Sequence, residues 1–208
     1  MTFASNSLQT FLDQVASVEP APGGGSVAAL SGALAASLVA MVCRLTIGKK
    51  GYEQVGDELQ EILPRAEKLQ SELRDLMQAD TDAYARVMDA YKLPKITEDE
   101  KIARTRAIQD ALKQASDIPL RVAELCAQIL ELARPVAEKG NKNAASDCGV
   151  GALMAEAGLR GAGLNVSINL GAINDELYVT RHRTRVAKLV AEADQAKREI
   201  LNIVEGRL

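Results

Sequence analysis

The sequence of 208 residues is poor in aromatic side chains, with no tryptophan, two phenylalanines and four tyrosines. Aromatic and β-branched residues fill the pleated surfaces of β-sandwiches and barrels, so this scarcity argues against those folds. Hydrophobic residues make up 47% of the chain and charged residues 25%, which is typical of a globular protein and argues against intrinsic disorder. A core with so few aromatics must use Ala, Leu, Val, Ile and Gly, which favours closely packed helices.

Basic residues are not in excess, because 25 Lys and Arg stand against 28 Asp and Glu. Proteins that bind nucleic acid through its phosphates usually carry a basic surplus, so we expect no nucleic-acid partner. Cysteine is also scarce: Cys43, Cys126 and Cys148 form no CxxC motif, and each lies among apolar residues. We therefore expect buried thiols without a disulfide framework or zinc site, in a reducing compartment.

Histidine is limited to His182, which lies between two arginines in a charged C-terminal segment. We expect this residue at the surface. A Ser-His-Asp triad or a His-rich metal site would depend on it, so we expect neither, and no metal. Any catalysis must then use carboxylates, amides, backbone groups and lysine.

The N-terminal segment has no basic residue before Arg44, which argues against a signal or transit peptide and favours a cytoplasmic protein. Residues 27–47 are long and apolar enough to cross a bilayer. They are dominated by Ala, Gly and Ser, which insert more weakly than Leu, Ile or Phe. We expect a buried helix and no membrane partner.

Apolar residues recur at helical spacing along the chain, and Gly- and Pro-rich turns interrupt them. The pattern predicts helices over residues 7–19, 27–47, 54–91, 98–138, 144–173 and 175–205. We predict a single all-α domain over residues 1–208, an antiparallel bundle of about five long helices plus a short N-terminal helix.

Local signals refine the ends of these helices. Ser26 is the predicted N-cap of the second helix, and Thr97-Glu98-Asp99-Glu100 is a capping box that opens the fourth. We expect Pro64, Pro119 and Pro135 to mark kinks or breaks.

Two helices carry faces of small residues. The faces are Ser26, Ala29, Ala33, Ala36 and Ala40 in the second helix, and Ala144, Gly151, Gly158, Asn165 and Ala172 in the fifth. Small side chains let helices approach closely, within a bundle or across a dimer. A groove for a flat ligand is the alternative.

The turn Pro20-Ala-Pro-Gly-Gly-Gly-Ser26 is the first candidate site. The backbone N–H groups of Gly23, Gly24 and Gly25, at the start of a helix, favour negative charge. The phosphate-loop pattern GxxxxGK[ST] is absent, and a simple tight turn explains the glycines equally well.

The second candidate site contains Asn141, Lys142, Asn143, Ser146 and Asp147. Asn143 and Asp147 are four residues apart and share a helix face. A carboxylate near a helix N-terminus stays ionised and can accept a proton or pair with a cation. The alternative is that Asn143 or Ser146 merely caps the helix.

Asn165 and Asn169 form another pair four residues apart. Asp147 and Asn165 lie on one face, but about 27 Å apart along a straight helix. They would serve opposite ends of a long ligand, or different subunits of a dimer.

A third cluster is Asp80-Thr-Asp-Ala-Tyr84, with two carboxylates and a phenol within about one helical turn. Asp82 is its candidate catalytic residue, and a solvated helix face is the alternative. Lysines at predicted helix ends are candidates to bind an anionic tail or simply to keep the surface soluble; they are Lys49, Lys50, Lys92, Lys95 and Lys142.

Together these segments resemble the cyclodeaminase/cyclohydrolase family of folate enzymes. The resemblance extends over essentially the whole chain, in order: PAPGGGS (20–26), MVCRLTIGKK (41–50), DAY (82–84), KLPK (92–95), EKGNKNAASD (138–147), GVGALM (149–154) and GAGLNV (161–166). It implies an all-helical homodimer without a metal or other cofactor.

The family resemblance implies one of two activities. The first is methenyltetrahydrofolate cyclohydrolase, a short free-standing chain that converts 5,10-methenyltetrahydrofolate to 10-formyltetrahydrofolate. The second is formimidoyltetrahydrofolate cyclodeaminase, which releases ammonia and is paired with a transferase. The segment Thr46-Ile-Gly-Lys-Lys50 and the short chain favour the cyclohydrolase. A folate-binding helical module without catalysis is a further alternative.

The resemblance also suggests roles for the candidate residues. Asp147 is the predicted general base, with Asp82 as the second choice. The predicted substrate-binding residues are Gly23, Gly24, Gly25, Ser26, Lys49, Lys50, Asn141, Lys142, Asn143, Ser146, Asn165 and Asn169.

Overall fold

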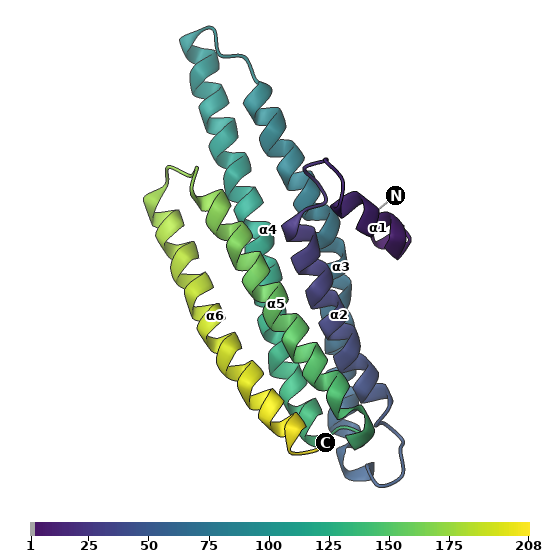
Figure 1. The fold of residues 1–208 in the computed structure, drawn as a ribbon. Coiled ribbons are helices and arrows are strands. Elements are labelled where there is room, and N and C mark those ends of the chain that lie inside the picture. Colours follow the sequence, from purple (N-terminus) through teal and green to yellow (C-terminus); the bar gives the residue numbers. More distant parts are fainter. Residues whose placement is uncertain (1–2) are drawn as a thin grey trace.

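The computed structural model describes residues 3–208, which form six α-helices and no β-strand (Figure 1). The α-helices are α1 (Leu8–Val15), α2 (Gly24–Arg44), α3 (Gly56–Lys92), α4 (Glu98–Lys139), α5 (Ala145–Leu170) and α6 (Glu176–Glu205). Three short 3-10 helices are η1 (Phe3–Ser5), η2 (Glu53–Val55) and η3 (Lys142–Ala144). These elements confirm the predicted all-α fold of five long helices and a short N-terminal one.

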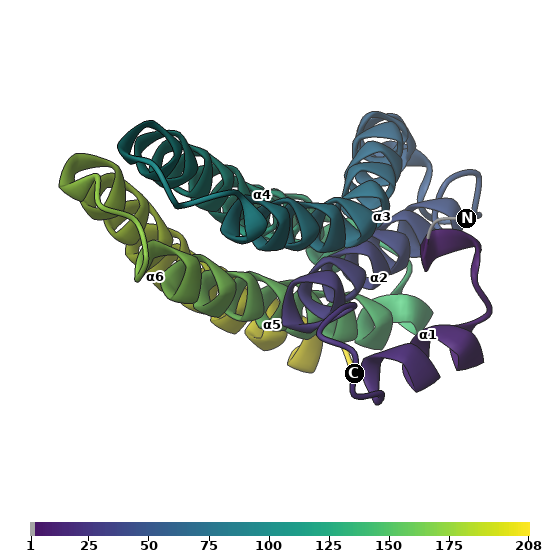
Figure 2. The ribbon, with the colours of Figure 1, turned by 90° about the horizontal axis from the view of Figure 1, so that it is seen from above.

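The long helices alternate in direction and form two layers (Figure 2). One layer contains α3 and α4, whose joined ends project beyond the rest of the bundle, and the other contains α2, α5 and α6. Helix α5 is central, because it packs against α2, α4 and α6. The N-terminus and the C-terminus of α5 lie in different regions of the bundle, far from each other.

Close approach of α2 and α5 depends on their small residues. A Cβ atom at Gly158 would lie 2.9 Å from the Ala28 carbonyl oxygen and 3.1 Å from Cys126 Sγ. The predicted tight packing of small residues within the bundle is therefore confirmed. Helix α2 is the one helix in residues 3–208 that is long and apolar enough to cross a membrane, and 61% of its most apolar window is buried inside the protein.

The expected helix breaks at proline are not found, because α3 continues through Pro64 and α4 through both Pro119 and Pro135. An internal proline costs a helix about 3 kcal/mol. Burial of flanking residues such as Ile62 and Val136 outweighs this cost, since tertiary packing supplies most helix stability.

Ser26 was wrongly predicted to cap α2. The helix begins at Gly24 with Gly23 as its N-cap, so Ser26 lies inside the first turn. Glycine is an acceptable N-cap because its backbone reaches the required conformation freely. The Ser26 side chain is buried, and its hydroxyl donates a hydrogen bond to the Met77 carbonyl at 2.7 Å.

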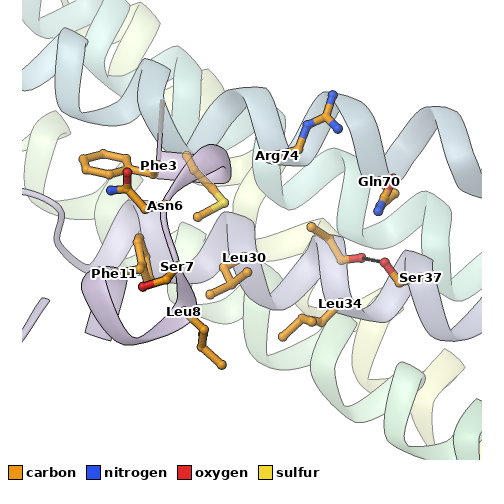
Figure 3. Close-up of a pocket in the computed structure, with 12 residues that line it drawn as sticks. Phe3, Asn6, Ser7, Leu8, Phe11, Leu30, Leu34, Ser37, Gln70 and Arg74 are labelled. Atoms are coloured by element: carbon orange, nitrogen blue, oxygen red, sulfur yellow. Dashed lines mark hydrogen bonds between the residues drawn. The ribbon is translucent and has the colours of Figure 1, made fainter. Parts of the chain in front are cut away.

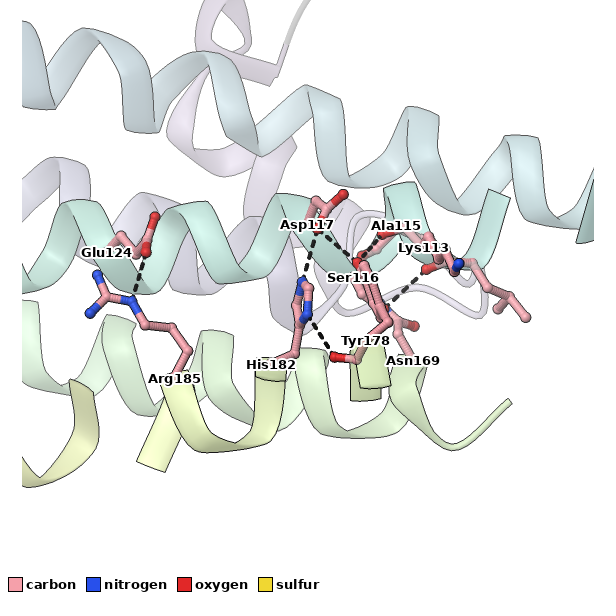
Figure 4. Close-up of polar contacts among 10 residues, drawn as sticks. Lys113, Ala115, Ser116, Asp117, Glu124, Asn169, Tyr178, His182 and Arg185 are labelled. Atoms are coloured by element: carbon pink, nitrogen blue, oxygen red, sulfur yellow. Dashed lines mark hydrogen bonds and ion pairs between the residues drawn. The ribbon is translucent and has the colours of Figure 1, made fainter. Parts of the chain in front are cut away.

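The prediction that His182 lies at the surface is also wrong, because the residue is only 3% exposed. Its Nε2 lies 3.0 Å from Asp117 Oδ1 and its Nδ1 lies 3.0 Å from the Tyr178 carbonyl oxygen (Figure 4). Its ring stacks on that of Tyr178. Neighbouring residues on a helix point in different directions, so the flanking arginines reach solvent while His182 faces α4.

All three cysteines are buried, as predicted. Burial raises the pKa of the Cys43 thiol to about 11, and it also raises those of Cys126 and Cys148. These thiols therefore stay protonated at neutral pH and act as small apolar side chains.

Candidate active site

A cavity of about 340 Å³ lies where the start of α2 meets the second half of α3 and the end of α5. It brings together three segments that the sequence singled out separately. They contribute Gly23, Gly24 and Gly25 from the glycine turn, Asp80, Thr81 and Tyr84 from α3, and Asn165 and Asn169 from α5. Val87, Met88 and Tyr91 extend the α3 wall with apolar and aromatic surface.

Asp80 lies against the first turn of α2. A Cβ atom at Gly25 would be 2.1 Å from Asp80 Oδ1, so the Asp80 carboxyl can keep this position only while residue 25 is glycine. Burial raises the pKa of the Asp80 carboxyl, and hydrogen bonding from the Ser26 backbone partly opposes the shift. A carboxyl with a raised pKa beside a cavity is a typical general acid or base.

The position of Asp80 is fixed by a contact between helices. The Ser26 hydroxyl donates its hydrogen bond to the carbonyl of Met77, one turn before Asp80 on α3. This bond holds the start of α2 against the part of α3 that carries the carboxyl. Ser26, predicted to bind substrate, does not line the cavity; its hydroxyl joins the two helices that form the cavity walls.

Asn165 and Asn169 form the wall of the cavity on α5. Asn165 Nδ2 donates to the Gly161 carbonyl at 2.9 Å. Asn169 Nδ2 donates to the Ala115 carbonyl at 2.7 Å, and Figure 4 labels both of these residues. The amide orientations are assigned from these bonds. Each Oδ1 then has no hydrogen-bond partner in the part of the chain that the structure describes, so both residues offer acceptors to a ligand.

The other predicted site residues gather at the opposite end of α2 and α5. There the turn of Lys49 and Lys50 packs against the segment of Asn141, Lys142 and Asn143. The bonds joining them run from the Asn141 N–H to Thr46 Oγ1 at 2.8 Å and from the Lys142 N–H to the Tyr52 hydroxyl at 2.9 Å. The structure thus unites these two loops, but not with the glycine turn.

Ser146 and Asp147 lie in the first turn of α5, at this same end. The predicted cap by Asn143 or Ser146 is absent, because α5 has no side-chain cap and Asn141 instead caps η3. Asp147 does not line the Asp80 cavity. Within one chain, the predicted base and the glycine turn therefore lie at different ends of the bundle.

Asp82 lies on the exposed side of α3, where its Oδ1 accepts a hydrogen bond from Gln78 Nε2 at 2.9 Å. It does not line the cavity, whereas Asp80, two residues earlier, does. The sequence identified the cluster but not the carboxylate that faces inward.

A second cavity, of about 260 Å³, lies between the N-terminal segment and helices α2 and α3 (Figure 3). Its walls are mostly apolar, and Phe11, Leu30 and Leu34 contribute to them. Arg74 is the one charged side chain among the described residues that line it. Because it has no carboxylate, it suits acid–base chemistry less well than the Asp80 cavity.

The chain is similar to known proteins in sequence and in fold. The profile of the family described as Formiminotransferase-cyclodeaminase matches residues 7–188. The chain belongs to this family. The family match includes the glycine turn, the Asp80 cavity and both loops of the opposite end.

Individual members of the formiminotransferase-cyclodeaminase family have two kinds of name. The chain is 44% identical to a methenyltetrahydrofolate cyclohydrolase of Methylorubrum extorquens, over 98% of both proteins. It is 36% identical to the formimidoyltransferase-cyclodeaminase of Rattus norvegicus, but spans only 37% of that longer protein. A crystal structure of a formiminotetrahydrofolate cyclodeaminase from Thermotoga maritima superimposes with a TM-score of 0.87, at 34% identity and 97% coverage of both chains.

Proposed function

We propose that this protein hydrolyses 5,10-methenyltetrahydrofolate to 10-formyltetrahydrofolate in one-carbon metabolism. The observation that carries the proposal is the position of the half-buried Asp80 carboxyl. It extends from α3 against the glycine turn, in a cavity that also has aromatic and amide side chains in its walls. The cyclohydrolase of Methylorubrum extorquens, similar over nearly its whole length, supports the choice of reaction.

In the proposed mechanism Asp80 acts first as base and then as acid. The bridging carbon of the substrate carries an amidinium-like cation, which the carboxylate stabilises. Asp80 takes one proton from water while the water oxygen bonds to that carbon. The bond from the carbon to N5 then breaks and Asp80 returns the proton to N5. The second water proton leaves to solvent, and the carbon remains on N10 as a formyl group.

We also propose that this reaction needs no cofactor, because the bridging carbon is already electrophilic. We assign substrate binding to the glycine turn and to Asn165 and Asn169. The free Oδ1 atoms of the two asparagines can accept hydrogen bonds from the N–H groups of a pterin ring. We also propose that the protein is cytoplasmic.

A cyclodeaminase is the second candidate function. It is favoured by the likeness to the Thermotoga maritima cyclodeaminase over the full chain. The Asp80 cavity would hold that substrate in the same way, because the cyclodeaminase reaction also takes place at a one-carbon group on N5 of a tetrahydrofolate.

The test is the loss of near-ultraviolet absorbance of 5,10-methenyltetrahydrofolate, with purified protein against a buffer blank. We expect loss that scales with protein concentration and yields 10-formyltetrahydrofolate. No acceleration over the blank would overturn the proposal. Ammonia release from the formimino substrate would then favour the cyclodeaminase, and binding without turnover would favour a folate-binding module.

We further propose that the protein is a homodimer joined through α5. Apolar residues are spread around this helix and not confined to one face, a pattern that indicates packing on several sides. Its outer stripe is nevertheless open: Val150 is 50% exposed, Leu164 73% and Ile168 76%. Ala157 lies at the middle of the stripe, with Val150 and Leu164 seven residues to either side.

A two-fold axis through Ala157 suits this stripe, because it would set two copies of α5 antiparallel at a point where the side chains are small. Leu164 would then pack against Val150 of the partner subunit. The same axis would bring Lys142 of the partner subunit to the end of α5 that carries Asn165. The two groups of predicted site residues, separate in one chain, would meet across the interface.

Leu164→Glu should therefore make the protein monomeric and lower its activity at least about tenfold, because it places a charge within an apolar interface. The molar mass in light scattering after gel filtration gives the oligomeric state. The matched control is Leu177→Glu, which changes an exposed leucine at the start of α6 outside the stripe. A monomeric unaltered protein, or a dimeric Leu164→Glu variant, would contradict this interface.

A further inference from the structure

The hydroxyl of Thr81, a partly buried residue, is exceptional among the buried polar groups. Its Oγ1 is the one buried side-chain oxygen or nitrogen in residues 3–208 without a hydrogen-bond partner. Comparable hydroxyls in the bundle are satisfied: Ser116 donates to the Leu112 carbonyl, and Thr46 donates to the Val42 carbonyl. Thr81 follows Asp80 in the sequence and also lines the Asp80 cavity.

The contact between α2 and α3 explains why this hydroxyl is unpaired. A threonine within a helix usually donates to the carbonyl four residues earlier, which here is that of Met77. The Ser26 hydroxyl already donates to this carbonyl, at 2.7 Å. The bond that positions Asp80 therefore takes the usual partner of Thr81.

An unpaired buried hydroxyl destabilises a protein, and such groups are rare in native structures. It also has no hydrogen bond to lose when it turns. Rotation about the Cα–Cβ bond exchanges the hydroxyl and methyl groups of threonine between staggered positions. A ligand beside Asp80 would give the Thr81 hydroxyl the hydrogen-bond partner that it lacks within the protein.

We propose that Thr81 orients the reacting water in the cyclohydrolase reaction, an inference that rests on the proposed function. Its Oγ1 accepts one hydrogen of the water while Asp80 takes the other as a proton. A lone pair of the water oxygen then points at the bridging carbon. No bond to Thr81 forms or breaks, so the overall reaction is unchanged.

This role predicts that stability and activity change in opposite directions in Thr81→Val, which replaces the hydroxyl by a methyl group of similar size. The midpoint of thermal unfolding should rise, because an unpaired buried hydroxyl is removed. Turnover should fall at least about tenfold with KM changed less than about twofold, because the water and not the folate loses a contact. Thr81→Ser keeps the hydroxyl and should retain turnover within about threefold.

The matched control for stability is Thr46→Val, since the Thr46 hydroxyl is paired twice, donating to the Val42 carbonyl and accepting from the Asn141 N–H. Its unfolding midpoint should fall. If Thr81→Val is stabilised but as active as the unaltered protein, Thr81 has no role in the reaction. If Thr81→Val unfolds earlier, the hydroxyl is paired in the folded protein and the inference is overturned. If the unaltered protein itself does not accelerate the reaction, the proposed function fails instead.

Discussion

Asp80→Asn should lower the turnover of 5,10-methenyltetrahydrofolate about 1000-fold and leave the fold intact. Asparagine keeps the shape of the side chain but can neither take a proton from water nor stabilise the cationic carbon. The measurement is the rate of absorbance loss at saturating substrate, after subtraction of the buffer blank. Asp82→Asn is the matched control, because it removes an exposed carboxylate two residues away. It should retain full turnover.

Stability and pH dependence separate the chemical role of Asp80 from a structural one. Burial raises the pKa of its carboxyl above the ordinary 3.8 in the folded state only. The stability that this group contributes is present below pH 3.8 and is lost as pH rises through the folded pKa. At neutral pH, Asp80→Asn should therefore unfold at the same or a higher temperature than the unaltered protein.

The raised pKa of Asp80 has a kinetic consequence as well. The carboxylate form is lost as pH falls through this pKa, so kcat/KM of the unaltered protein should decline at a pH above 3.8. A decline centred at or below that pH would contradict the assignment of Asp80 as base.

Gly25→Ala should lower turnover about 100-fold, the second-largest effect that we expect. The new Cβ would lie 2.1 Å from Asp80 Oδ1 and 2.4 Å from its Cγ, so the carboxyl group must move away from α2. The displaced carboxyl would no longer meet the water at the bridging carbon. Circular dichroism would establish that the helices remain, and the same absorbance assay gives the loss.

Gly56→Ala is the control for this substitution. Gly56 begins α3, and a Cβ atom there meets nothing within 4 Å. This variant should keep its turnover and gain slightly in stability, because alanine favours a helix. A Gly25→Ala variant as active as Gly56→Ala would show that the contact between the glycine turn and Asp80 does not matter for turnover.

The helices could be predicted from the sequence because their signals are local. The capping box at Thr97 and Glu100 forms as predicted. Ser26 shows the limit, because its role is a hydrogen bond to Met77, 51 residues away in sequence. No local pattern distinguishes a serine that caps its own helix from one that pins a neighbouring helix.

Helical spacing in the sequence places Asp80 and Asp82 on different faces of α3. Buried Leu73 and Met77, followed by Asp80, Tyr84 and Tyr91, recur at spacings of three, four and seven along α3. Asp80 therefore interrupts the apolar stripe of the helix, whereas Asp82 lies on another face. A carboxylate on an apolar stripe indicates either a buried partner or a site.

His182 follows the same rule. Val186, Leu189 and Ala193 continue its face of α6 at helical spacing, and Leu189 and Ala193 are buried. The two flanking arginines make this part of the sequence look charged and exposed, so the apolar stripe that includes His182 is not recognised.

The distance between the two groups of site residues depends on helix length and on the arrangement of the bundle. The order of the motifs along the sequence does not reveal how far apart these two groups lie in the folded protein. Gly24 and Asn165, 141 residues apart, meet because α2 and α5 are antiparallel and packed together. Asp147 and Asn165 share one helix, yet lie about 27 Å apart.

Asp80 and Asp147 are compared most directly by measuring Asp80→Asn and Asp147→Asn in one assay of 5,10-methenyltetrahydrofolate hydrolysis, at equal protein concentration. If Asp80 is the base, Asp80→Asn loses turnover about 1000-fold and Asp147→Asn loses no more than about tenfold. Loss of turnover in Asp147→Asn with full turnover in Asp80→Asn would assign the base to Asp147 and contradict the role of Asp80.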